Sequence, residues 1–197
     1  MRAVRAISGR AVPLERSDVD TDQIIPSEWL KRIERTGFGA GLFAEWRDDP
    51  SFVLNRPEYA GATILFAGRN FGTGSSREHA VWALADYGFR AVVSSRFGDI
   101  FCQNATKSGL VAAEVDEDLA RRLAASVMAD PSVDVTLDVE KLTIEIPAAG
   151  IEGRFILPDD AQFRLVHGLD DIDLTLERAG LIERYEQSRP SFMPRVS

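Results

Sequence analysis

The residues with the clearest potential for chemistry lie together in the stretch "GRNFGTGSSREHAVWALADYGF", residues 68–89. Gly72 and Gly74 relax the backbone just before two adjacent serines and an arginine, Ser75, Ser76 and Arg77. A glycine-rich turn that leads into a helix directs free backbone N–H groups and the positive end of the helix dipole at its mouth. Arginine adds a planar fork of donors that suits a carboxylate. The stretch therefore predicts a site for a small oxyanion or carboxylate.

Familiar glycine-loop and nucleophile signatures do not fit this stretch. The chain has no P-loop, no third glycine of a dinucleotide-binding fingerprint after Gly74, and no GxSxG nucleophile elbow. A purely structural interpretation stays open, because Ser75 followed by Glu78 matches a capping box in which the hydroxyl only satisfies a backbone N–H. Both roles can also share the site, with Ser76 as the cap and Ser75 facing a ligand.

The predicted elements around these residues are a strand, the glycine turn, a helix and a second strand. Residues 62–68 and 89–95 are continuous apolar runs, and residues 76–87 read as the helix between them. Parallel strands that are buried on both faces have this composition, and their order makes a βαβ unit. We therefore predict an α/β fold in which a βαβ unit carries the loop.

The rest of the chain predicts one domain with an appendage, built from several further elements. The expected elements are a strand or hairpin over 3–14, a short helix over 27–35, an irregular, cleft-lining segment over 96–111, an amphipathic helix over 115–129, a hairpin over 133–146 that turns near Glu140, and one or two closing helices with a loose tail.

Composition restricts the classes of function. A net charge of −8 argues against a general nucleic-acid surface, and the N-terminal residues contain no apolar run for a signal peptide or membrane span. One cysteine, Cys102, excludes an internal disulfide and cannot by itself build a zinc or iron–sulfur site. We expect a cytoplasmic protein without nucleic-acid or membrane partners and without a metal or cofactor of its own.

The acidic segment "SDVDTDQIIP", residues 17–26, has aspartates at two-residue spacing, as calcium loops do. It lacks the glycine and the distal bidentate glutamate of such loops. The alternative is a polar loop whose Asp and Thr side chains satisfy their own backbone.

Five sequence blocks are distinctive: "DTDQIIP" (20–26), "RTGFGAGLF" (35–43), "NFGTGSSREHAVWAL" (70–84), "SRFGDIF" (95–101) and "GLDDIDLTLERAGLIERYEQSRPSFMP" (168–194). These blocks resemble the small subunits of isopropylmalate isomerase (3-isopropylmalate dehydratase) in the aconitase superfamily. The blocks span nearly the whole chain in the expected order. The resemblance implies a single aconitase-type swivel domain over 1–197, layered β/β/α, with 170–197 as a C-terminal helical extension and tail.

The implied reaction is the interconversion of 2-isopropylmalate and 3-isopropylmalate, by dehydration to 2-isopropylmaleate and rehydration, in leucine biosynthesis. The resemblance also implies a hetero-oligomer with a large iron–sulfur subunit, whose 4Fe-4S cluster acts as the Lewis acid. Two alternatives stay open. One is the small subunit of a related hydro-lyase for homoaconitate, citraconate or 2-methylmalate, and the other is a non-catalytic anion-binding assembly module.

The resemblance also implies roles for individual residues toward a 2-hydroxy dicarboxylate. Ser75 is the base that removes the carbon-bound proton, and Ser76 and Arg77 bind carboxylate oxygens. A second cation is expected from the short helix, with Arg35 as first choice and Arg32 as the alternative. Solvated charges on a helix face are the competing interpretation for both arginines.

Other residues are expected to support the site or the core. Gly74 shapes the loop, and Asp22 orients its own segment without touching substrate. Gln23 stands where aconitases proper tend to carry a histidine. His79 is expected to pack, and His167 and Cys102 are expected to be structural.

Overall fold

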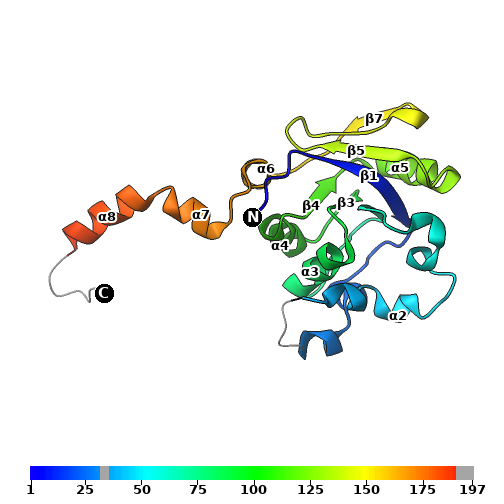
Figure 1. The fold of residues 1–197 in the computed structure, drawn as a ribbon, viewed down its shortest axis with the longest axis horizontal. Coiled ribbons are helices and arrows are strands. Elements are labelled where there is room, and N and C mark those ends of the chain that lie inside the picture. The colour runs from blue at the N-terminus through cyan, green and yellow to red at the C-terminus, as the bar shows by residue number, and fades with distance from the viewer. Residues whose placement is uncertain (32–35, 190–197) are drawn as a thin grey trace.

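The computed structural model describes residues 1–31 and 36–189 (Figure 1). Its centre is a seven-stranded sheet with the strand order β4-β3-β2-β1-β5-β6-β7. The strands are β1 (Ala6–Leu14), β2 (Ile64–Ala67), β3 (Ala91–Ser94), β4 (Val111–Glu114), β5 (Asp134–Asp138), β6 (Thr143–Ile146) and β7 (Ile151–Arg154). The α-helices are α1 (Thr21–Ile24), α2 (Ala44–Arg47), α3 (Glu78–Tyr87), α4 (Asp99–Ser108), α5 (Glu117–Ala129), α6 (Asp159–His167), α7 (Asp171–Leu176) and α8 (Ala179–Ser188).

Strand β1 joins a parallel half of the sheet to an antiparallel half. Its first residues pair antiparallel with β5, from Ala6 opposite Asp138. Its last residues pair in parallel with β2, from Ala11 opposite Ile64. Strands β2, β3 and β4 continue the parallel half, and β6 and β7 continue the antiparallel half. The strand and the hairpin that the sequence predicts at 3–14 and 133–146 are confirmed.

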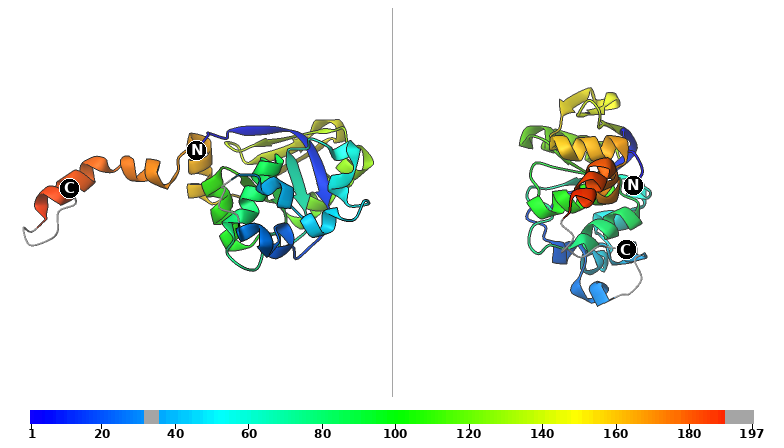
Figure 2. Two further views of the ribbon diagram at one scale, coloured as in Figure 1. Left: turned by 60° about the horizontal axis from the view of Figure 1, so that its bottom comes forward. Right: turned by 90° about the vertical axis from the view of Figure 1, so that its left-hand side faces the viewer.

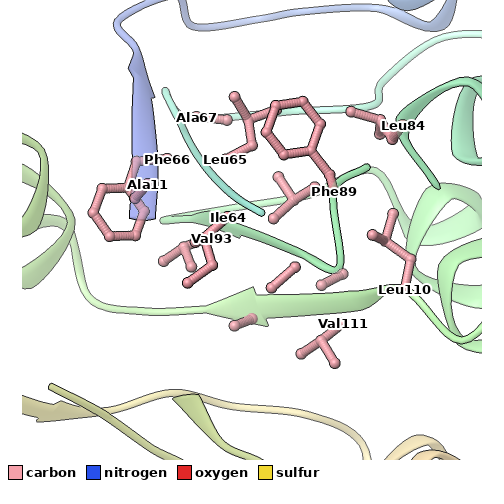
Figure 3. Packing of buried hydrophobic residues seen from close by; sticks show 14 of the residues in the cluster. Ala11, Ile64, Leu65, Phe66, Ala67, Leu84, Phe89, Val93, Leu110 and Val111 are labelled. Carbon is pink, nitrogen blue, oxygen red and sulfur yellow. The ribbon is translucent and has the colours of Figure 1, made fainter. Parts of the chain in front are cut away.

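The parallel strands form the centre of the core. Every residue of β2 and β3 is buried, as expected for strands covered on both faces. Figure 3 shows buried side chains on both faces of the neighbouring strands: Ile64 and Val93 point to one face, and Leu84 of α3 lies on the other side, near Phe89. Burial of this apolar surface is the main stabilising contribution. The βαβ unit predicted from the two apolar runs is therefore confirmed as β2, α3 and β3.

Helix α5 shows how the sheet curls. It contacts β1, β2 and β3 of the parallel half and also β7 at the far edge. A side chain at Gly153 of β7 would place its Cβ only 2.2 Å from Leu119 of α5, so a glycine is needed for this close approach. The result is a mixed α/β fold with a curled sheet, and α5 matches the amphipathic helix predicted over 115–129.

The prediction of an irregular segment over 96–111 is wrong, because α4 occupies most of it. Gly98 precedes the helix, and Gly109 ends it with a left-handed φ of +76°. Phe101 and Ala105 lie one turn apart on its buried face. This narrow apolar stripe anchors a helix whose other residues, apart from Ile100 and Cys102, are polar.

The C-terminal region contains three helices, α6, α7 and α8, where the sequence predicts one or two. Helix α6 packs through Ala161 and Leu165, which are buried. Helices α7 and α8 have no buried residue and lead away from the sheet (Figure 2). None of the helices in the described ranges is long and apolar enough to cross a membrane.

Candidate active site

The loop between β2 and α3 presents the residues that the sequence singled out. Gly74, Ser75 and Ser76 are exposed, and Arg77 is half-buried beside them. Two glycines give the loop its tight path. Gly72 has φ +74°, and a Cβ there would lie 2.4 Å from the ring of Phe101. Gly74 has φ +88°, a conformation that favours glycine.

Helix α3 begins at Glu78, with Arg77 as its N-cap in an extended conformation and with no side chain that caps it. The alternative in which Ser75 and Glu78 form a capping box is therefore wrong, and Ser76 is not the cap either. Neither serine hydroxyl hydrogen-bonds to any residue in the described part of the chain. The helix starts later than the sequence suggests because contacts of the preceding loop, from Ser75 to Thr21 and from Arg77 to Asp22, keep Arg77 in an extended conformation. Both hydroxyls and the first N–H groups of α3 are left available to a ligand.

A second segment, residues 18–25, runs beside the loop and holds it. The N–H of Gly72 donates to the carbonyl of Val19 at 2.8 Å, and that of Thr21 donates to the carbonyl of Thr73 at 3.0 Å. The buried hydroxyl of Thr21 donates to the carbonyl oxygen of Ser75 at 3.0 Å. Sequence reasoning missed Thr21, although its place between two aspartates in "DTDQIIP" was a signal.

The aspartates of this segment satisfy the protein's own groups. Asp20 caps α1 by accepting from the N–H of Gln23 at 2.8 Å, and the side chain of Gln23 accepts from the N–H of Asp20 at 2.9 Å. This reciprocal pair is a capping box, so the interpretation that aspartate side chains satisfy their own backbone holds for Asp20. It is wrong for Thr21, whose hydroxyl bonds to the distant Ser75 carbonyl, and the segment contains the short helix α1 instead of a loop throughout.

The guanidinium of Arg77 contacts the carboxylate of Asp22 as an ion pair. Only 17 % of the Arg77 side chain is exposed, against 53 % for Asp22, so the carboxylate is the more solvent-accessible member of the pair. Arg77 Nη1 is the atom that contacts Asp22 Oδ1, so this donor is engaged by the ion pair. Nε and Nη2 make no hydrogen bond to the residues described, so these two donors of the guanidinium remain available.

The predicted second cation lies outside the described residues, because Arg32 and Arg35 fall in the segment 32–35. The chain just after this segment returns to α3. The N–H groups of Gly37 and Phe38 both donate to Asp86 Oδ2, at 2.8 and 3.0 Å. Sequence reasoning did not find Asp86, since nothing local links it to Gly37.

Both histidines make packing contacts. The ring of His79 lies between those of Phe38 and Trp82, with centroids 5.2 and 4.7 Å away. The ring of His167 packs in a tilted arrangement against that of Phe163, with centroids 4.4 Å apart, and its Nδ1 lies 2.9 Å from the carbonyl oxygen of Phe163.

The chain does not offer ligands for an iron–sulfur cluster. Such clusters are held by several cysteine thiolates, and Cys102 is the single cysteine of the sequence. Over the residues that the structure describes, no group of three His, Cys, Asp or Glu side chains could hold a metal ion.

Cys102 lies on α4, half-buried. Burial raises the pKa of its thiol to about 11, with smaller contributions from the carboxylates of Glu114 and Asp99. The thiol is protonated below this pKa, and the thiolate is the nucleophile. We therefore expect alkylation by iodoacetamide at mildly alkaline pH to be about a hundredfold or more slower than for free cysteine, and to accelerate as the pH rises toward the pKa. Mass spectrometry of pulse-labelled protein measures this rate, and labelling as fast as that of free cysteine would contradict the assignment.

Comparison with protein families adds evidence from known sequences. The sequence pattern of the family described as Aconitase C-terminal domain matches residues 1–118. A 3-isopropylmalate dehydratase small subunit from Rubrobacter xylanophilus is 56% identical over 196 residues, which cover 100% of both chains. Another from a Parafrankia species is 59% identical over 194 residues, which cover 98% of each chain.

Comparison with solved structures agrees with these relatives. A crystal structure of 3-isopropylmalate dehydratase from Methanocaldococcus jannaschii superimposes with a TM-score of 0.68 at 27% identity. The match covers 91% of this chain and 99% of the other. The aconitase-type swivel fold implied by the sequence blocks is therefore confirmed.

Proposed function

The chain belongs to the Aconitase C-terminal domain family and, within it, to the 3-isopropylmalate dehydratase small subunits, and from this membership we propose how its site takes part in the reaction. Members of this family are part of a two-subunit hydro-lyase. The reaction interconverts 2-isopropylmalate and 3-isopropylmalate through 2-isopropylmaleate, and it belongs to leucine biosynthesis.

The chemistry that we assign to this chain is proton transfer at carbon. In the dehydration, Ser75 takes the proton from the carbon next to the one that bears the hydroxyl. The electron pair of the broken C–H bond forms the double bond, and hydroxide leaves from the neighbouring carbon. In the rehydration, hydroxide adds to the carbon that lost the proton, and Ser75 gives its proton to the other carbon of the double bond, which gives the isomeric hydroxy acid. The exposed hydroxyl of Ser75 supports this role, because no described residue occupies it.

A serine must lose its own proton to act as a base, which is costly in water. Two features around Ser75 favour the alkoxide. The uncapped first turn of α3 directs backbone N–H groups and the positive end of its dipole toward the loop. The guanidinium of Arg77 adds a positive charge two residues away, and closure of the site by a partner would strengthen both effects by excluding water.

Substrate carboxylates are the groups that Ser76 and Arg77 bind in this proposal. The Nε and Nη2 donors of Arg77, which make no hydrogen bond to the residues described, support it, since a planar guanidinium matches a carboxylate with two parallel hydrogen bonds. Asp22 then positions Arg77 through their ion pair, and Gly74 gives the loop its turn. We propose Arg35, or Arg32 in its place, as the second carboxylate-binding cation.

The remaining half of the centre we place on the large subunit. That subunit holds the 4Fe-4S cluster in our proposal, because this chain has one cysteine to offer. The substrate is a small 2-hydroxy dicarboxylate, and the assembly works in the cytoplasm. Residues 1–197 act as one swivel-type domain, with 170–197 as an extension.

The main observation behind the proposal is that the exposed Ser75 and Ser76 and the ion-paired Arg77 lie directly before the uncapped N-terminus of α3. The test is to mix the chain with its large partner under anaerobic conditions and assay a panel of 2-hydroxy di- and tricarboxylates. We expect the highest kcat/KM for the two isopropylmalates and negligible calorimetric binding of isopropylmalate to the chain alone. A preference for homoaconitate, citraconate or 2-methylmalate would show that the enzyme is a related hydro-lyase with a different substrate. Tight binding of isopropylmalate by the chain alone would indicate a non-catalytic anion-binding module.

A further inference from the structure

The last two helices carry an apolar face that no described residue covers. We call residues 171–188, which comprise α7 and α8, the arm. Its large apolar side chains are strongly exposed, Ile172 by 70%, Leu176 by 64%, Leu181 by 58% and Tyr185 by 63%. In each helix these residues are spaced by one turn, so each helix presents its own apolar stripe. Between the helices lies a hollow of about 550 Å³, lined by Leu181, Tyr185 and their neighbours.

The root of the arm is fixed to the body by charged groups. The N-terminal ammonium of Met1 lies 3.7 Å from the carboxylate of Asp170. Asp171, the first residue of α7, pairs with Lys107 of α4 at 3.3 Å and with Arg164 of α6. Figure 2 shows the arm leading away from the sheet in the direction that this root sets. The apolar stripes therefore point outward from an anchored base, and the body does not cover them.

Exposed apolar residues also connect the arm to the site loop. Nine large hydrophobic side chains are exposed in the described part of the chain. Five of them lie on the arm, three lie on α4, on α6 or in the segment just before α6, and Met128 lies on α5. The three are Ile100 of α4, Phe163 of α6 and Ile156. Helices α4 and α6 contact each other.

The residue that precedes the N-terminus of α4 contacts the site loop. The N–H of Gly98, the residue before α4, donates to the carbonyl of Phe71 at 3.0 Å. A Cβ at Gly98 would lie only 2.4 Å from the carbonyl oxygen of Gly72. The exposed apolar residues thus follow a set of contacting elements from the loop that carries Ser75 to the tip of the arm.

We propose that the arm docks onto the large iron–sulfur subunit and holds the small subunit with its Ser75 loop facing the partner. This inference rests on the proposed function, which supplies a partner that must close over the loop. Apolar faces of this kind are covered in a working assembly. A single partner that covers the loop, the exposed residues of α4 and α6, and the arm forms one continuous interface. The partner surface that fits is an apolar groove that accepts two short amphipathic helices.

The test uses the full chain with two exposed residues of α8 changed, Leu181→Lys together with Tyr185→Lys. The matched control is Glu183→Gln together with Gln187→Lys, which adds the same charge on the opposite side of the helix. Titration calorimetry with the large subunit under anaerobic conditions gives the Kd. Because truncation of central apolar anchors has large effects, we expect the apolar-face variant to bind about 30-fold or more weakly and the control to stay within about threefold of wild type. At saturating large subunit both should keep the wild-type kcat.

Binding of the apolar-face variant with wild-type Kd would overturn the proposal. So would a dimer of the small subunit alone that this variant dissociates, since the arm would then cover a second copy. Thermal unfolding of both variants at the wild-type temperature shows that the body keeps its fold. A wild-type chain that binds the large subunit but does not turn over isopropylmalate would count against the proposed function and leave the arm proposal standing.

Discussion

Replacement of Ser75 by alanine is expected to reduce kcat of the assembled enzyme by roughly 10² to 10⁴, the range attributed to a positioned general base. The change removes one hydroxyl that hydrogen-bonds to no described residue, so the fold and the loop path stay intact. Carboxylate binding should persist, because Arg77 and the N–H groups of α3 are untouched. The measurement is the rate of 2-isopropylmaleate formation, followed by its ultraviolet absorbance, at saturating 2-isopropylmalate.

The neighbouring Ser76→Ala variant is the matched control for this prediction. It removes the same group one residue away, and its hydroxyl is also exposed and free of described partners. In our assignment this hydroxyl binds a carboxylate, so its loss should raise KM by about tenfold and change kcat much less. Equal kcat values for Ser75→Ala and wild type would remove Ser75 from the mechanism.

Replacement of Arg77 by lysine is the second prediction with a large effect. Lysine keeps the positive charge and loses the planar donor fork, so two parallel hydrogen bonds to a carboxylate become one. We expect kcat/KM to fall by about 10- to 100-fold, with a higher KM and a lower kcat, because hydrogen bonds to charged groups are worth about 1.5–3 kcal/mol. Steady-state kinetics over a range of substrate concentrations separate the two parameters.

The control for Arg77 is Asp22→Asn, which removes the negative charge of the ion pair and keeps the side-chain shape. Arg77 retains its fork in this variant, so the loss of kcat/KM should be smaller than for Arg77→Lys. Unchanged kinetics in Arg77→Lys would show that the guanidinium fork does not bind substrate.

Local patterns in the sequence predicted the elements and part of the site. Two fully apolar runs separated by a glycine turn and a helical segment were enough for β2, α3 and β3, because each of these features is contiguous. Ser75, Ser76 and Arg77 were singled out as candidates for the same reason, because they are adjacent in the sequence. The narrow apolar stripe of α4, in which Phe101 and Ala105 are set among polar residues, was too weak a signal.

Contacts between distant segments could not be predicted in this way. The start of α3 at Glu78 depends on how the loop is held by residues 18–25, which lie far from it in sequence. The hydrogen bond from Thr21 to Ser75 and the ion pair between Asp22 and Arg77 arise from that same contact. The direction of the arm likewise depends on Met1, at the opposite end of the chain.

The central claim is that this chain supplies the proton-removing half of a shared hydro-lyase centre. A structure of the anaerobically assembled two-subunit enzyme with bound 2-isopropylmalate tests it most directly. We predict that Ser75 Oγ lies within about 3.5 Å of the carbon that loses its proton, and that the guanidinium of Arg77 lies on a substrate carboxylate. A complex in which Ser75 faces away from the substrate, and a side chain of the large subunit approaches that carbon instead, would contradict the claim.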